Sequence, residues 1–267
     1  MNDDSIRTST TFASHTRKTT IRVLKALGIH PVLQRTLNRL PDPLLKLAVR
    51  YGGKRELVPR TRLTAVYIDA LQRLKAAAGR QPLGDYLEFG VYQGTAMLCM
   101  AEAMRALGLT EMRLFGFDSF EGLPPNASEE DSGVWKPGEF SSSLEYTRAY
   151  LKHHGVDMSR LHLIKGWFSE TLTEQLKAEY NIHSASVLMF DCDLYSSTRD
   201  ALAFGMPLLC EHGVVLFDDW HSRGLSDQNL GERRAFEEYL AQNPAYSVEE
   251  MPSYDEMAKV FWVMRVN

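Results

Sequence analysis

Apolar residues recur at helical spacing in the first part of the chain. Between residues 18 and 79, the segments IRVLKALGI, PLLKLAVRY and LTAVYIDALQRLKAA place them at i, i+3 and i+4, and Pro or Gly residues separate the segments. Residues 1–16 are polar and carry no such pattern. The sequence therefore predicts a disordered tail and a helical N-terminal extension, which together span residues 1–79.

From residue 80 the pattern changes to short apolar strands that alternate with longer amphipathic helices. The strand-like runs are YLEFGV, MRLFGFDS, RLHLIKGW, SVLMFDCDLY and GVVLFDDW, and a helical pattern follows each of them. Two of these helices are expected over residues 169–180 and 196–209. These steps predict an α/β domain over residues 80–267, with helices on both faces of a doubly wound, mostly parallel sheet. The last two runs, YSVEEMP and AKVFWVMRV, have no helix between them and are predicted to form a C-terminal antiparallel hairpin.

Aspartates cluster where two of the predicted strands end. SVLMFDCDLY contains Asp191 and Asp193, and GVVLFDDW contains Asp218 and Asp219. Because the carboxyl ends of parallel strands line the ligand crevice of such a sheet, we expect these carboxylates to face one small volume. An oxygen-rich cluster of this kind suits a hard divalent cation such as Mg²⁺. A single aspartate after a strand often only caps the next helix, but four on two strands favour a cation site.

The first predicted strand leads into a glycine-containing turn, Glu88-Phe89-Gly90-Val91-Tyr92-Gln93-Gly94. Glycine at two of these positions lets the backbone turn tightly and approach a ligand closely. A pyrophosphate site would require G-x-G-x-x-G, whereas this turn places a carboxylate where a phosphate would be repelled. The turn better suits a cationic cofactor without phosphate, such as S-adenosylmethionine, although a strand–helix turn without a ligand has the same pattern.

Two further strand ends carry candidate cofactor contacts. Asp118 ends the second strand, where a carboxylate is suited to accept hydrogen bonds from ribose hydroxyls. After the third strand, Gly166 permits close approach of a ligand, and Trp167 and Phe168 could flank an adenine ring. Core packing explains the two aromatic residues equally well.

Composition and cysteine usage are those of a reduced, soluble globular protein. Cys99, Cys192 and Cys210 lie in apolar segments without close paired spacing, which argues against a disulfide framework or a zinc site. No apolar run has the length of a signal peptide core or a membrane span. We therefore expect a cytoplasmic protein without a transmembrane segment.

The net charge of −4 hides an uneven distribution. Residues 1–62 contain 13 Lys and Arg against 4 Asp and Glu, and the remainder contains 17 against 30. A basic segment before an acidic body can indicate nucleic acid or an anionic membrane as a partner. Here the basic residues are interleaved with Leu, Ile and Val at helical spacing, which favours docking onto the acidic body and a homo-oligomer over nucleic-acid binding.

Several motifs, taken in order, resemble the macrocin O-methyltransferase family, whose members are metal-dependent enzymes that methylate hydroxyls of deoxysugars on natural products. They are LEFGVYQG, FGFDSFEGLPP, W-x-x-G-E-F at residues 135–140, KGWFSETL, FDCDLYSSTRDAL and FDDW. The resemblance covers about residues 60–266. It implies a class I methyltransferase (Rossmann-like) sheet, S-adenosylmethionine as methyl donor and a magnesium ion near the acceptor.

The resemblance also implies roles for individual residues. Asp191, Asp218 and Asp219 match the metal ligands, and Asp193 matches the proposed general base. His221 stands where a small residue is common in the family, and it is the alternative candidate for the base. The positions that fall in the cofactor-binding segments are Glu88, Gly90, Tyr92, Gly94, Asp118, Ser119, Gly166, Trp167, Phe168 and Ser169.

Two segments leave the acceptor open. The stretch HSRGLSDQNLGERRAFEEYL after the second aspartate pair is longer than the family pattern, and residues 126–140 are expected to form a mobile cover over the site. A glycoside, a glycolipid and a non-sugar diol all remain possible acceptors. A nicotinamide-dependent oxidoreductase is disfavoured by the missing third glycine and the antiparallel ending. The remaining alternative is a non-catalytic metal-binding scaffold.

Overall fold

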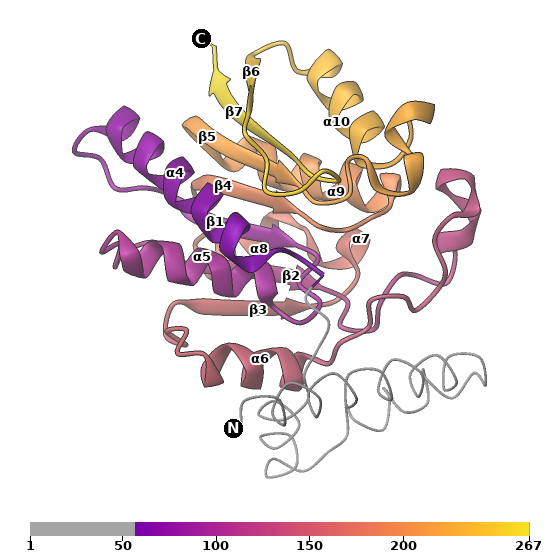
Figure 1. The fold of residues 1–267 in the computed structure, drawn as a ribbon, viewed down its shortest axis with the longest axis horizontal. Coiled ribbons are helices and arrows are strands. Elements are labelled where there is room, and N and C mark those ends of the chain that lie inside the picture. The colour runs from indigo at the N-terminus through magenta and orange to yellow at the C-terminus, as the bar shows by residue number, and fades with distance from the viewer. Residues whose placement is uncertain (1–56, 267) are drawn as a thin grey trace, which may run out of the picture. The chain divides into compact units, whose positions relative to one another are not determined.

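A computed structural model of the chain describes residues 57–266 (Figure 1). The predicted disordered tail and the first two helical segments of the extension lie outside these residues. The helices are α4 (Arg60–Ala78), α5 (Thr95–Ala106), α6 (Leu144–His153), α7 (Phe168–Thr171), α8 (Glu174–Tyr180), α9 (Tyr195–Gly205) and α10 (Gly231–Gln242). The strands are β1 (Asp85–Phe89), β2 (Leu114–Asp118), β3 (Leu161–Lys165), β4 (Ala185–Phe190), β5 (Leu209–Phe217), β6 (Tyr246–Met251) and β7 (Lys259–Arg265).

The strands form one seven-stranded sheet in the order β3-β2-β1-β4-β5-β7-β6. Strands β1 to β5 are parallel, and β7 lies antiparallel between β5 and β6, as Figure 1 shows. The order reverses between β1 and β4, and an open sheet of this kind binds its ligands at such a switch point. The predicted doubly wound sheet with a C-terminal antiparallel hairpin is confirmed.

Two element boundaries differ from the predicted ones. The single helix expected over residues 169–180 is divided into α7 and α8, because Thr173 caps the second helix by accepting a hydrogen bond from the Leu176 N–H at 3.2 Å. The helix expected to reach residue 209 ends at Gly205, where a 3-10 turn, Met206–Leu208, contains Pro207. Strand β5 therefore begins at Leu209, four residues earlier than expected.

Helices cover both faces of the sheet. One hydrophobic cluster joins α4, α5 and α6 to one face, and a second joins α8, α9 and α10 to the other. Helix α4 was predicted as part of an extension, but five of its side chains are fully buried in the first cluster: Leu63, Tyr67, Ala70, Leu71 and Leu74. The expected boundary at residue 79 therefore falls within a single core.

A ladder of four stacked phenylalanines crosses the central strands of the sheet. Phe117, Phe89, Phe190 and Phe217 are neighbours in register on β2, β1, β4 and β5. Their successive ring centroids are 5.1, 5.2 and 5.0 Å apart, with the rings nearly parallel. Each phenylalanine closes its strand's apolar run, so the ladder brings the residues that follow to the same edge of the sheet. Those residues include Gly90, Asp191 and Asp218.

The cysteines form no disulfide among the described residues. All three cysteines are free, with Cys99 and Cys192 buried and Cys210 half-buried. Within residues 57–266, no helix combines the length and the apolar character needed to cross a bilayer.

Candidate active site

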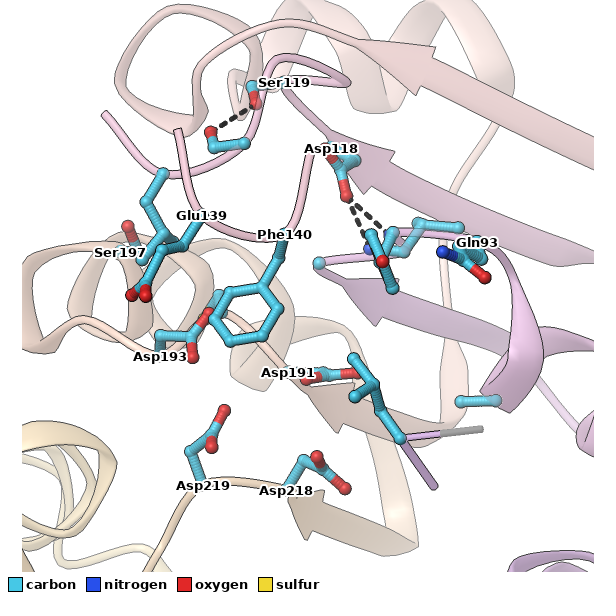
Figure 2. Close-up of a pocket in the computed structure, with 18 of the residues that line it drawn as sticks. Gln93, Asp118, Ser119, Glu139, Phe140, Asp191, Asp193, Ser197, Asp218 and Asp219 are labelled. Atoms are coloured by element: carbon cyan, nitrogen blue, oxygen red, sulfur yellow. Dashed lines mark hydrogen bonds between the residues drawn. The ribbon is translucent and has the colours of Figure 1, made fainter. Parts of the chain in front are cut away.

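A cavity of about 270 Å³ opens at the carboxyl ends of the strands. Its lining comes from the turns after β1 to β5, from residues 122–124 and 139–140 of the long segment after β2, and from the loop between β6 and β7. Figure 2 shows Asp191, Asp193, Asp218 and Asp219 in the lower half of the view and Asp118 in the upper half. The predicted acidic cluster and part of the predicted cofactor turn therefore share one cavity.

Asp191, Asp218 and Asp219 form the part of the site that could hold a metal ion. One carboxylate oxygen from each lies within 4.8 Å of the others. Burial and then the charge of Asp218 raise the pKa of Asp191 well above its ordinary value, and burial and the charge of Asp219 raise the pKa of Asp218 to about 7. A divalent cation at this position would offset the repulsion between the carboxylates, and its preferred ligands are such oxygens. The donor set therefore fits a hard cation.

Two buried residues that the sequence did not identify support these carboxylates. The Tyr254 hydroxyl, on the loop between β6 and β7, donates a hydrogen bond to Asp218 Oδ1 at 2.5 Å. Glu232, in the first turn of α10, accepts a hydrogen bond from the Asp219 N–H at 2.9 Å through Oε2. An acidic residue in a helix's first turn is a common capping feature, and a tyrosine in a hairpin loop is no signal by itself, so neither residue stands out in the sequence.

Asp193 occupies a strained and buried position beside the cluster. Its φ of 63° lies in the left-handed region, which non-glycine residues rarely adopt, and its side chain is 6% exposed. Strain of this kind persists where the surrounding structure fixes it, and it gathers at functional sites. Burial and the neighbouring Asp219 carboxylate raise the pKa of Asp193. A carboxylate with a raised pKa is a stronger base, which agrees with the expected role of this residue.

Asp118 lines the cavity but is already engaged with the glycine turn. Its Oδ2 accepts hydrogen bonds from the N–H groups of Val91 and Tyr92 at 2.7 and 2.8 Å, and its Oδ1 accepts from the Phe120 N–H at 2.5 Å. These bonds hold Tyr92 at a φ of 49°. The carboxylate therefore shapes the turn, in addition to being placed where it could contact a ligand.

Glu88 lies behind the turn and does not line the cavity. It is fully buried, and its Oε2 accepts a hydrogen bond at 2.6 Å from the Tyr86 hydroxyl, which also contacts the Tyr67 hydroxyl of α4 at 2.9 Å. Its Oε1 has no hydrogen-bond partner among the described residues. Burial raises the pKa of Glu88 to about 8. The sequence predicts that Glu88 contacts the cofactor, but its side chain lies behind the glycine turn and not at the cavity.

Of the other residues predicted to bind the cofactor, most line the cavity and two do not. Gly90, Tyr92, Ser119, Gly166, Trp167 and Phe168 line the cavity. The Phe168 ring also packs edge-on against Phe89, with 6.0 Å between the ring centroids, so Phe168 both lines the cavity and packs against the core. Gly94 precedes α5 with a φ of 84° and does not line the cavity, and neither does the exposed Ser169.

His221, the alternative base, does not line the cavity either. Its Nδ1 lies 2.7 Å from the Ser226 hydroxyl, and its backbone N–H donates to the Met257 carbonyl at 2.8 Å. These contacts join the loop after the second aspartate pair to the hairpin loop. The structure therefore places Asp193, and not His221, at the cavity.

The segment 126–140 is fastened over the site by buried contacts. Asp131 accepts hydrogen bonds from the Tyr195 and Gly231 N–H groups, both at 2.9 Å, at the first residues of α9 and α10. Trp135 is 1% exposed and carries the guanidinium of Arg223 over its ring at 4.0 Å. The segment ends at Glu139 and Phe140, which line the cavity. It therefore lies beside the site and shares a small hydrophobic cluster with Leu194 and Leu225. Its predicted mobility stays a prediction.

The pattern of residues also matches a known family. A family model described as Macrocin-O-methyltransferase (TylF) matches residues 55–261. The chain belongs to the macrocin O-methyltransferase family. The resemblance inferred from the motifs is thereby confirmed, and the match includes the whole acidic cluster and the glycine turn.

Two curated relatives act on natural products, according to their names. The 8-demethyl-8-(2,3-dimethoxy-alpha-L-rhamnosyl)-tetracenomycin-C 4'-O-methyltransferase of Streptomyces olivaceus is 33% identical over 143 residues, which are 51% of this chain and 53% of that protein. The demethyldecarbamoylnovobiocin O-methyltransferase of Streptomyces niveus is 27% identical over 172 residues, 61% of this chain and 64% of that protein. The chain thus aligns with between about half and two-thirds of the length of these relatives.

Solved structures of O-methyltransferases share the fold of this family member. The O-methyltransferase NovP superposes with a TM-score of 0.63 at 22% identity, over 77% of this chain and 80% of NovP. CalS11, described as a TDP-rhamnose 3'-O-methyltransferase, superposes with a TM-score of 0.53 at 22% identity, over 88% of this chain and 92% of CalS11. At these identities the likeness concerns the fold alone, and it confirms the predicted class I methyltransferase sheet.

Proposed function

We propose that this family member transfers a methyl group from S-adenosylmethionine to a hydroxyl of a sugar on a natural product. The observation that carries the proposal is the shared cavity, which residues 90–93 of the glycine turn line together with the aspartates that follow β4 and β5. The names of the curated relatives, which are sugar and natural-product O-methyltransferases, support the same activity. A glycolipid or a non-sugar diol is a less well-supported acceptor.

We further propose that Asp191, Asp218 and Asp219 hold a divalent cation such as Mg²⁺. When bound, the cation lowers the pKa of an adjacent hydroxyl, and S-adenosylmethionine supplies an electrophilic methyl group. Tyr254 orients the Asp218 carboxylate through its hydrogen bond, and Glu232 holds the backbone N–H of Asp219. Contacts of this kind typically change metal affinity by about 10- to 100-fold.

Asp193 is the proposed general base. Its carboxylate would take the proton that the acceptor hydroxyl loses when its oxygen replaces the sulfur on the methyl group, which would leave S-adenosylhomocysteine. Proton transfer of this kind contributes about 10² to 10⁴ in rate. The left-handed backbone at Asp193 holds the side chain at the cavity. Phe140, from the covering segment, and Leu123, which precedes that segment, line the cavity with apolar surface. Positioning of the acceptor supplies most of the remaining rate enhancement.

The test separates metal binding from proton transfer. Methyl transfer from radiolabelled S-adenosylmethionine to a panel of neutral glycosides is measured with Mg²⁺ and with excess EDTA, and affinities for S-adenosylhomocysteine and Mn²⁺ are measured by calorimetry. Asp191→Asn is expected to lose Mn²⁺ binding and turnover while it keeps S-adenosylhomocysteine. Asp193→Asn is expected to keep both ligands and lose about 10² to 10⁴ in turnover.

The control is Asp200→Asn, which changes an aspartate of α9 that pairs with Arg199 outside the cavity. It should retain wild-type turnover and both affinities. Full activity of the wild-type enzyme in EDTA would refute the metal role, and wild-type turnover of Asp193→Asn would assign the base to another residue.

A further inference from the structure

One side chain of the loop after β5 contacts the covering segment, residues 126–140, at three points. The Cζ atom of Arg223 lies 4.0 Å from the centroid of the Trp135 ring. Its guanidinium also donates hydrogen bonds to the Val134 carbonyl and, at 3.3 Å, to Glu139 Oε2. A planar guanidinium can stack on a ring and donate from its edge at the same time, which an ammonium group cannot do. These contacts therefore depend on the shape of the arginine side chain and not only on its charge.

The same loop is a tight turn that begins at a proposed cation ligand. The Ser222 N–H donates to the Asp219 carbonyl at 3.0 Å, and the Gly224 N–H donates to the His221 carbonyl at 3.3 Å. Within this turn Arg223 has a φ of 53°, in the left-handed region that non-glycine residues rarely adopt. Such a conformation persists where neighbouring contacts fix it. The position of Arg223 is therefore tied to that of Asp219 through the backbone of the turn.

A second link joins the covering segment to Asp219 at the start of α10. The Gly231 N–H donates to Asp131 Oδ1 at 2.9 Å. The next residue, Glu232, accepts from the Asp219 N–H, also at 2.9 Å. Asp131 and Glu232 are 7% and 1% exposed, so both hydrogen bonds lie in a low-dielectric environment, which strengthens them. The covering segment is therefore connected to the Asp219 loop near residue 131 and again at residues 134–139.

The conformation of the covering segment has a free-energy cost. Asp131, Ser132 and Phe140 have φ values of 47°, 60° and 57°. The buried Nε1 of Trp135 has no hydrogen-bond partner among the described residues. Left-handed backbone at non-glycine residues and buried unpaired donors both disfavour a conformation. Contacts from outside the segment offset this cost, so a change in those contacts shifts the population of this conformation.

We propose that Arg223 is a positioning residue that couples the covering segment to the proposed cation site. The inference rests on the proposed metal role of the three aspartates and adds the regulation of that site. Without a cation the three carboxylates repel one another, whereas a bound cation holds them together and thereby fixes the Asp219 loop. Arg223 then holds Glu139, with the adjoining Phe140, at the cavity that both residues line (Figure 2).

The coupling is reciprocal. If the cation favours the ordered covering segment, the ordered segment must strengthen cation binding by the same factor. A purely electrostatic role of Arg223 predicts otherwise, because a positive charge near the carboxylates weakens cation binding and lysine retains that charge. Replacement of Arg223 by lysine therefore separates the two roles.

Hydrogen exchange of the full chain tests the coupling without a substitution. Exchange is followed by mass spectrometry with S-adenosylhomocysteine present. Saturating Mn²⁺ should slow the exchange of residues 126–140 by at least about five-fold, as a typical coupling between two sites does. Peptides from α8, which makes none of these contacts, are the internal reference and should exchange at the same rate with and without Mn²⁺.

Arg223→Lys keeps the charge and loses the planar group. It should bind Mn²⁺ at least about five-fold more weakly, keep its affinity for S-adenosylhomocysteine, and lose the effect of Mn²⁺ on the exchange of residues 126–140. Arg73→Lys is the matched control, because Arg73 also lies over a tryptophan, Trp262 at 4.1 Å, and pairs with a glutamate, Glu249 at 2.9 Å. Arg73 does not line the cavity, and its variant should behave as the wild type does in all three measurements.

Two results would reject the coupling. They are exchange of residues 126–140 that Mn²⁺ leaves unchanged in the wild type, and an Mn²⁺ affinity of Arg223→Lys equal to or higher than that of the wild type. A wild-type chain that binds no Mn²⁺ would instead reject the proposed metal role, and the coupling with it. The contact of Arg223 with the covering segment would still be measured in that case, as faster exchange of residues 126–140 in Arg223→Lys than in Arg73→Lys without metal.

Discussion

Tyr254 and Glu88 each support one half of the site. Tyr254 lies beside Asp218, and Glu88 lies behind the glycine turn. Both side chains are fully buried, and neither lines the cavity. Each makes a short hydrogen bond, from Tyr254 to Asp218 and from Tyr86 to Glu88. Their effects should therefore appear in metal affinity and in the pH dependence of stability.

Tyr254→Phe removes the hydroxyl that donates to Asp218. We expect about ten-fold weaker Mn²⁺ binding with unchanged affinity for S-adenosylhomocysteine, because the ligand carboxylate loses the group that orients it. Mn²⁺ titration followed by electron paramagnetic resonance measures the change. The control is Tyr246→Phe on β6, which loses a comparable hydrogen bond to the Met206 carbonyl and should bind Mn²⁺ normally. Equal Mn²⁺ affinity in both variants would contradict the positioning role.

Glu88→Gln changes how stability depends on pH. Burial raises the Glu88 pKa from 4.5 to about 8, so the folded state retains a proton that the unfolded state releases. This contribution is fully present below pH 4.5 and is lost as pH rises through 8. The variant should therefore gain stability relative to the wild type between pH 5.5 and 8.5, by roughly 3 kcal/mol at about 1.4 kcal/mol per pKa unit.

Urea unfolding at the two pH values measures this difference. Glu179→Gln, at an exposed position of α8, should leave the pH dependence of the wild type nearly unchanged. If the free energy of unfolding of Glu88→Gln changes with pH as that of the wild type does, the Glu88 carboxyl group is ionised in the folded protein.

At the scale of elements, one buried aspartate is among the residues that hold the segment 126–140. Asp131 joins it to the first residues of α9 and α10 at once. Asp131→Asn places an amide N–H against a backbone N–H, which should cost about 1.5 to 3 kcal/mol. We expect faster hydrogen exchange in residues 126–140 and weaker acceptor binding, with S-adenosylhomocysteine affinity unchanged.

Asp157→Asn provides the matched comparison. Asp157 also accepts a backbone hydrogen bond, from the Ser159 N–H at 3.0 Å, but in an exposed turn that does not line the cavity. Its variant should leave the exchange of residues 126–140 as in the wild type. Similar exchange in the two variants would mean that Asp131 does not hold the covering segment.

The order of the helices and strands could be predicted from the sequence because each strand contains an apolar run with a distinct end. The same pattern could not separate α7 from α8, since the division depends on one capping hydroxyl at Thr173. The stacked phenylalanines also leave a pattern in the sequence, because a Phe directly precedes each of Gly90, Asp118, Asp191 and Asp218. A strand that slipped by one residue would place an aspartate in the core, so this arrangement also specifies register.

The site was predictable only where its residues follow strands. Asp191, Asp193, Asp218 and Asp219 were found because sheet geometry brings strand ends together. Tyr254 and Glu232 come from a hairpin loop and a helix start, whose proximity to the cluster depends on tertiary packing. The binding of Asp118 to backbone N–H groups likewise depends on the conformation of a neighbouring turn.

At the scale of the whole molecule, α4 is part of the same core as the sheet. Leu71 lies on α4 with no exposed surface, so Leu71→Ala should destabilise the protein by about 2 to 5 kcal/mol. The most protected amides of α4 and β4 should then exchange with the same free energy, because both report global unfolding. Gln72→Ala, on the exposed side of α4, should have little effect. Separate melting of α4 would instead make it an independent unit.

The antiparallel hairpin has a consequence for the order in which the protein matures during synthesis. A nascent chain that has emerged as far as α10 already contains Asp191, Asp218 and Asp219, but it lacks the tyrosine that orients Asp218. It also lacks β7, which inserts between β5 and β6 only after both have been made. The proposed cation site would therefore be completed only after the hairpin has been synthesised.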